Sequence, residues 1–165
     1  MLLEQFNGAD RTEAIARLRP CIDVTRWCEH LADHRPYGSI DELLREAGVA
    51  ASPFTGDEVA QALSHHPRIG ERASGDSTEA TLSRSEQAGL GSVDDEIAQA
   101  LAEGNAAYDA RFGRVFLIRA AGRSPREILD QLTARLGNDD ATEDGIVAEQ
   151  LREIAVLRLK GILSP

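Results

Sequence analysis

The residues best suited to chemistry in this sequence lie between His65 and Leu90, in the stretch HHPRIGERASGDSTEATLSRSEQAGL. Most of the stretch is a long run of polar and small residues, and long connections in compact domains are usually functional or disordered. One end carries His66, and the other carries Glu86 followed by Gln87. An imidazole, a carboxylate and a carboxamide together favour a binding site over a plain linker.

His66 continues the apolar stripe of Val59 and Leu63 on a helix expected to start near Thr55 and to end before Pro67. The dipole at a helix C-terminus favours a protonated imidazole, which suits proton transfer near neutral pH. The alternative interpretation is a capping or half-buried structural histidine.

Glu86 has two interpretations, because it is also the last residue of a recurring pattern. Ser, Thr or Asp followed three residues later by Glu is typical of a capping box at a helix start. As a functional residue, Glu86 beside Gln87 could read the N–H and C=O edges of a ring ureide. Ser83 would add donors at a helix N-terminus, where anions bind. The pattern occurs at Asp10–Glu13, Ser39–Glu42, Thr55–Glu58, Ser83–Glu86 and Ser124–Glu127.

Arg158 continues the apolar stripe Val147, Leu151 and Ile154 of the last expected helix. Arginine is seldom fully buried unless it is paired. A guanidinium on a core-facing stripe therefore calls for a carboxylate from the protein or from a ligand, unless it extends to solvent at the helix end. Arg119 invites the same interpretations.

Five helix-start signals predict an all-α protein, and 165 residues with 42% hydrophobic and 28% charged composition fit a single domain over residues 1–165. We expect a compact bundle of about eight helices. Their expected ranges are 11–19, 22–34, 40–47, 56–66, 84–90, 93–111, 125–136 and 143–161.

One apolar, β-branched run, from Val115 to Ala120, resists the helical interpretation. It lies between Gly113 and Gly122, and no partner strand is evident. We interpret it as extended chain crossing the core near the active site. Its backbone N–H and C=O groups then need partners, some of which a polar ligand could supply.

The net charge of -10 argues against binding to nucleic acid or to an anionic membrane. Cys21 and Cys28, if on one helix, lie roughly 10 Å apart along its axis, beyond the about 7 Å that a disulfide allows. Separate thiols, with no signal peptide and no membrane span in the sequence, indicate a cytoplasmic protein.

No metal site is expected around the loop. Its candidate ligands are His65, His66, Glu71 and Asp76, and their spacing matches no established ligand set. His65 is interpreted as a surface residue.

Four further motifs occur along the chain: HPRIGE at 66–71, SRSEQAG at 83–89, NAAY at 105–108 and RFGRVFLIR at 111–119. Together they resemble one family, the 2-oxo-4-hydroxy-4-carboxy-5-ureidoimidazoline (OHCU) decarboxylases of urate degradation, in the form usual for its bacterial branch. The resemblance covers nearly the whole chain.

The resemblance implies an all-α, often dimeric enzyme without a cofactor, which converts a small ureide substrate to S-allantoin. It implies that His66 and Glu86 are catalytic. The implied substrate-binding residues are Pro67, Ser83, Arg84, Ser85, Gln87, Phe116, Leu117, Ile118, Arg119, Ala120 and Arg158.

Two other functions compete with this one. A ureide or imidazoline hydrolase would need an activated water or nucleophile, and neither a metal motif nor a triad is visible. A non-catalytic helical binding protein would show an exposed apolar patch and no closed pocket.

Overall fold

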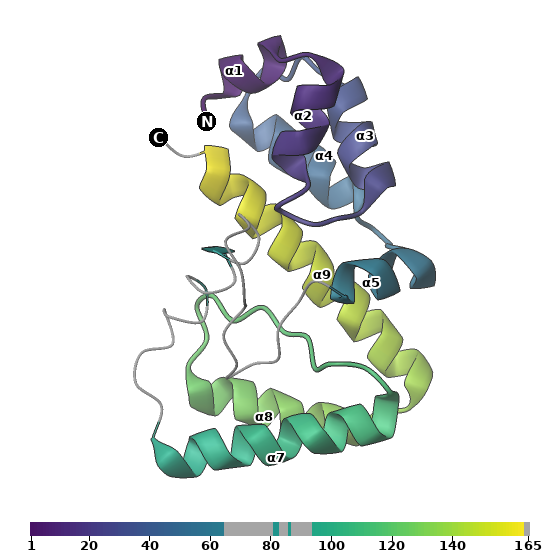
Figure 1. Cartoon of the computed structure of the whole chain (residues 1–165), viewed down its shortest axis with the longest axis vertical. Helices are drawn as coiled ribbons and strands as arrows, with labels where there is room; N and C mark the ends of the chain where they lie inside the picture. The colour runs from purple at the N-terminus through teal and green to yellow at the C-terminus, as the bar shows by residue number, and fades with distance from the viewer. Residues whose placement is uncertain (65–80, 83–85, 87–93, 164–165) are drawn as a thin grey trace. The chain divides into compact units, whose positions relative to one another are not determined.

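The computed structural model describes residues 1–64, 81–82, 86 and 94–163. Within these ranges the chain forms eight α-helices and no strand, so the predicted all-α class is confirmed (Figure 1). The chain divides into two compact units, Met1–Ala62 with Leu151–Pro165, and Leu63–Gln150. That residues 1–165 make a single domain stays a prediction.

The first unit contains five helices and the second half of the last helix. Their bounds are α1 Leu3–Gly8, α2 Arg11–Leu18, α3 Thr25–Asp33, α4 Ile40–Ala50, α5 Gly56–Leu63 and α9 Asp140–Leu163. Sequence patterns did not predict α1, which begins without a Ser, Thr or Asp cap: the Leu2 N–H donates instead to Gln5 Oε1.

Several predicted helix bounds were wrong. Helix α3 begins at Thr25 rather than at residue 22, and α9 extends over Asp140–Leu163 rather than over 143–161. Helix α4 continues past Gly48 to Ala50, because a glycine inside a helix costs only about 1 kcal/mol relative to alanine. Helix α5 ends at Leu63, three residues before the predicted end at His66, which lies outside the described residues.

Side-chain hydrogen bonds hold the helices of the first unit together. Trp27 is fully buried, and its Nε1–H donates to Ala47 O at 2.9 Å across the two helices. Arg35 joins the C-terminal ends of α1 and α3, because its guanidinium donates to Phe6 O, Ala9 O and Ala32 O, each at 2.7 Å. These bonds satisfy carbonyl groups at helix ends that would otherwise lack partners.

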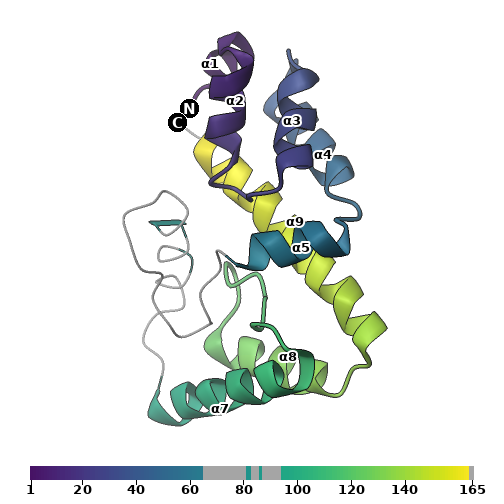
Figure 2. The ribbon, with the colours of Figure 1, turned by 45° about the vertical axis from the view of Figure 1, so that its right-hand side comes forward.

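The second unit contains α7 (Asp95–Phe112), α8 (Pro125–Leu136) and the first half of α9. Helices α7 and α8 lie side by side in both views (Figures 1 and 2). They approach so closely that a Cβ at Gly104 would lie 2.4 Å from Leu132 Cδ2. Gly113 ends α7 in the left-handed conformation, φ 70°, which glycine adopts without strain.

Four of the five predicted capping boxes lie wholly within the described residues, whereas Ser83–Glu86 does not. In each of the four, the first side chain accepts a hydrogen bond from the backbone N–H of the Glu. In the Thr55 box, Glu58 Oε1 also accepts from the Thr55 N–H at 2.8 Å, so both halves of the box are present.

The cysteine prediction is confirmed: Cys21 and Cys28 are buried thiols that form no disulfide. Burial raises the pKa of Cys28 to about 12, so this thiol stays protonated. No helix in the described part of the chain has the length and hydropathy needed to cross a membrane.

Glu58 provides a test of how the start of α5 is held. Burial raises the pKa of Glu58, but hydrogen bonds from Arg26 and Thr55 outweigh burial and lower it. We expect Glu58→Gln to reduce the free energy of unfolding by about 1 kcal/mol at neutral pH. Because the folded-state pKa is lowered, this stabilisation is present above the unfolded-state pKa of about 4.3 and is lost as the pH falls through the folded-state value.

Urea unfolding should therefore separate wild type from Glu58→Gln at neutral pH and bring them together in strong acid. Glu127→Gln is the matched control, since the Ser124 cap uses the backbone N–H of Glu127. An effect of Glu58→Gln that stays constant with pH would contradict a role for its charge.

Candidate functional site

Residues 115–120 form an extended segment without helix or strand, as the sequence predicted. Phe116, Leu117, Ile118 and Ala120 are buried. Phe116, Ile118 and Ala120 pack in one core with Leu101, Ile128 and Leu132 of α7 and α8. Burial on this scale requires that the backbone polar groups of the segment find partners inside the protein.

Side chains from α8, from α9 and from the turn before α8 supply those partners. Arg135 Nη1 of α8 donates to Leu117 O at 2.7 Å. The Arg119 N–H donates to Gln150 Oε1 of α9 at 2.9 Å, and Arg123 Nε donates to Arg119 O at 3.0 Å. The expected need for backbone partners is thus confirmed, and it is met at these positions by the protein itself.

A buried ion pair between Arg135 and Glu143 contacts the extended segment. Arg135 is 3% exposed and Glu143 is 0% exposed. Glu143 Oε1 accepts from Arg135 Nε at 2.8 Å and from Nη2 at 2.6 Å, and from the Tyr108 hydroxyl at 2.6 Å. Asn138 Nδ2 donates to Glu143 Oε2 at 3.1 Å. Both carboxylate oxygens are therefore hydrogen-bonded, which a buried charge requires.

Two further features hold the cluster. Burial, followed by the hydrogen bond to Glu143, raises the pKa of Tyr108, so its hydroxyl remains a donor at neutral pH. The Arg135 guanidinium carbon lies 4.5 Å from the centre of the Phe116 ring, in cation–π range. The guanidinium thus contacts the extended segment through a ring and through a backbone carbonyl.

The Arg135–Glu143 pair was not predicted from the sequence, although the position of each residue indicated burial. Glu143 lies four residues before Val147, at the head of the stripe that ends with Arg158. Arg135 lies three residues after Leu132 on the buried face of α8. Two opposite charges on core-facing stripes of consecutive helices indicate a buried pair.

Arg158 occupies the buried position that its stripe predicted. Val147, Leu151, Ile154 and Arg158 are all buried, and Arg158 is 3% exposed. Its Nη1 donates to Cys21 O at 3.4 Å within the first unit. Burial of this kind excludes the alternative in which the guanidinium extends to solvent. Arg119 is half-buried, and its Nη1 donates to Ala121 O at 2.7 Å.

The remaining predicted site residues are described only in part. Glu86 is helical and half-buried. The extended segment belongs to the second unit and Arg158 to the first, so the cavity expected to be shared by His66, Glu86 and Arg158 stays a prediction. The residues outside the described part are His66, Pro67, Ser83, Arg84, Ser85 and Gln87.

The buried pair gives a stability prediction with a control next to it. Glu143→Gln removes the charge that compensates Arg135, which should cost about 3–5 kcal/mol of unfolding free energy. Asp144→Asn breaks the neighbouring Arg114–Asp144 pair, whose Asp side chain is 63% exposed, and should cost at most about 1 kcal/mol. Equal losses of unfolding free energy in urea would show that the Glu143 charge contributes no more to stability than the exposed Asp144 charge.

The chain matches the family model described as OHCU decarboxylase over residues 7–160. It is 26% identical to the 2-oxo-4-hydroxy-4-carboxy-5-ureidoimidazoline decarboxylase of Haloferax volcanii, over 96% of this chain and 94% of that protein. It is also 26% identical to the uric acid degradation bifunctional protein of Bacillus sp. (strain TB-90), over 98% of this chain but 32% of that longer protein.

A solved structure agrees with these matches. It is a crystal structure of OHCU decarboxylase in the presence of (S)-allantoin, with a TM-score of 0.75 and 25% identity, covering 90% of this chain and 98% of that one. The matched proteins come from bacteria, an archaeon, a fish and a plant, so the matches do not assign a branch. The chain belongs to the OHCU decarboxylase family.

Proposed function

We infer that the chain is a carboxy-lyase that converts 2-oxo-4-hydroxy-4-carboxy-5-ureidoimidazoline to S-allantoin in urate degradation. The observation that carries this function is the family match over residues 7–160. The match to the Haloferax volcanii protein named 2-oxo-4-hydroxy-4-carboxy-5-ureidoimidazoline decarboxylase supports this function, because the chain spans 94% of that protein's length.

The substrate can provide its own electron sink. It carries a carboxylate and a hydroxyl on one ring carbon, next to a ring imine. When the bond to CO2 breaks, its electron pair forms a double bond to the neighbouring ring carbon, and the imine nitrogen takes up a proton, which gives an enol. The neighbouring ring carbon then takes a proton while the hydroxyl proton leaves, and the product is allantoin. The protein must align the breaking bond with the π system and deliver the proton to one face.

We assign the proton transfer to His66, which either accepts the hydroxyl proton or protonates the product carbon. Glu86 and Gln87 hold the ring and ureido groups through hydrogen bonds. Arg158 offsets the anionic charge of the substrate, a role supported by the burial of its guanidinium on a core-facing stripe.

The remaining substrate contacts are assigned to Pro67, to the block 83–85 and to the backbone of residues 116–120. For the last of these, the hydrogen bonds from Arg135 and to Gln150 give support, because they fix the segment from the neighbouring helices. A backbone fixed before the substrate arrives spends no binding energy on ordering.

We also propose three further properties. The resemblance suggests a homodimer and, through the form HPRIGE, the bacterial branch of the family. The two buried thiols that form no disulfide suggest the reducing environment of the cytoplasm.

The activity is tested by circular dichroism of a urate oxidation mixture after the hydroxyisourate step. Wild-type protein should accelerate the appearance of the S-allantoin signal, and His66→Ala should remove the acceleration while keeping the helical spectrum. A racemic product formed at an unchanged rate would reject the decarboxylase function. Near-normal turnover by His66→Ala would remove only His66 from the mechanism.

Glu86→Ala separates catalysis from helix capping. Loss of a cap costs about 1 kcal/mol of stability, so a capping residue alone would lower the melting temperature without changing the turnover of folded molecules. We expect Glu86→Ala to lose turnover far beyond that. Glu127→Ala, at the same offset in the Ser124 box, should leave the turnover of folded molecules unchanged.

A further inference from the structure

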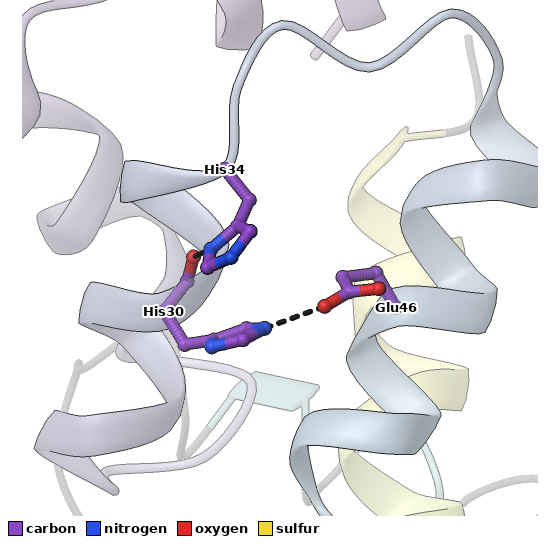
Figure 3. Close-up of side chains that lie close together, drawn as sticks. All are labelled: His30, His34 and Glu46. Atoms are coloured by element: carbon purple, nitrogen blue, oxygen red, sulfur yellow. Dashed lines mark hydrogen bonds and ion pairs between the residues drawn. The ribbon is translucent and has the colours of Figure 1, made fainter.

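A cluster of three metal-ligating side chains lies in the first unit, among residues that the proposed mechanism does not use. His30 lies on α3, His34 caps the C-terminus of that helix, and Glu46 lies on α4 (Figure 3). One ligand atom from each residue lies within 4.8 Å of the others, the only such His, Cys, Asp or Glu group within residues 1–64, 81–82, 86 and 94–163. Each of the three side chains retains some solvent access.

The backbone already places these groups together. His34 caps α3 four residues after His30, and its backbone N–H still donates to His30 O, so the two side chains lie one above the other. Their ring centres are 4.0 Å apart. Glu46 precedes Ala47, whose carbonyl accepts the Trp27 Nε1–H bond that ties α4 to α3. The Trp27–Ala47 hydrogen bond, one residue from Glu46, therefore holds α4 against α3 close to the three ligands.

The tautomer of His34 suits metal binding. Its Nδ1 lies 2.7 Å from the His30 carbonyl oxygen. A carbonyl can only accept, so Nδ1 carries the proton and Nε2 presents its lone pair. Metal-bound histidines usually have their second nitrogen held in this way by a carbonyl or carboxylate, which fixes the ring and its tautomer.

His30 and Glu46 form the second half of the cluster. His30 Nε2 lies 2.5 Å from Glu46 Oε1, so without an ion a single proton joins them. For both atoms to lie about 2.0–2.2 Å from one ion, their separation must widen by roughly 1 Å. The flexible, partly exposed Glu46 side chain, 33% accessible, can provide this by rotation about its own bonds.

We propose that His30, His34 and Glu46 bind one Zn²⁺ ion, which clamps α3 to α4. Two imidazole nitrogens and one carboxylate oxygen form a ligand set that Zn²⁺ accepts, with water in the fourth position. Ca²⁺ and Mg²⁺ prefer oxygen ligands alone. The net charge of -10 favours the approach of a divalent cation.

The alternative is that the cluster is only a hydrogen-bonded and stacked contact between two helices. The two possibilities differ at His34: the contact between the helices runs through His30 and Glu46, whereas the metal site also needs His34 Nε2. Removing His34 therefore weakens metal binding but leaves the His30–Glu46 hydrogen bond in place.

The test is isothermal titration of the untagged full-length chain with ZnCl2, together with melting curves with and without Zn²⁺. Wild type should bind one Zn²⁺ per chain and melt at a higher temperature in its presence. His34→Gln and Glu46→Gln should each weaken binding by at least the roughly 10- to 100-fold that loss of an outer-shell partner costs.

The matched control is His65→Gln, which removes a histidine outside the cluster and should bind Zn²⁺ as wild type does. Circular dichroism confirms that each variant is folded. A wild-type chain that binds no Zn²⁺ overturns the site. Zn²⁺ binding that is as tight in His34→Gln as in wild type, or that is lost in His65→Gln, also overturns the site, because the ion then binds elsewhere.

Discussion

The second unit depends on one buried charge pair. Arg135 and Glu143 lie on consecutive helices, and both side chains are buried. An unpaired charge at this depth would cost several kcal/mol. Helices α8 and α9 can therefore pack only in a register that brings the guanidinium to the carboxylate. The same register brings Tyr108 of α7 to Glu143, so three helices meet at one group.

That register also fixes the extended segment. Apolar side chains alone could be buried in several conformations, because hydrophobic burial has no direction. The hydrogen bond from Arg135 to Leu117 O and the bond from the Arg119 N–H to Gln150 are directional. Together they select one path for the backbone between Gly113 and Gly122.

The sequence predicted the local structure better than the pairing between helices. Ser124 and Pro125 gave the start of α8 to the residue, because capping is decided within one turn of chain. The stripe ending in Arg158 was buried as predicted. The Arg135–Glu143 pair was missed, because it forms only when two helices pack together. The family motifs named His66 and its partners, but their geometry lies beyond what local patterns determine.

Stability alone does not explain a buried Arg–Glu pair, since well-packed apolar residues of similar volume are often equally stable or better. An apolar residue at 135, however, could not donate to Leu117 O. That carbonyl would lose its bond from the Arg135 side chain in a buried position, at a cost of about 1–3 kcal/mol. Arginine at this position requires a buried counter-charge, which Glu143 provides. The ion pair with Glu143 therefore allows a buried arginine to donate a hydrogen bond to the backbone of the extended segment.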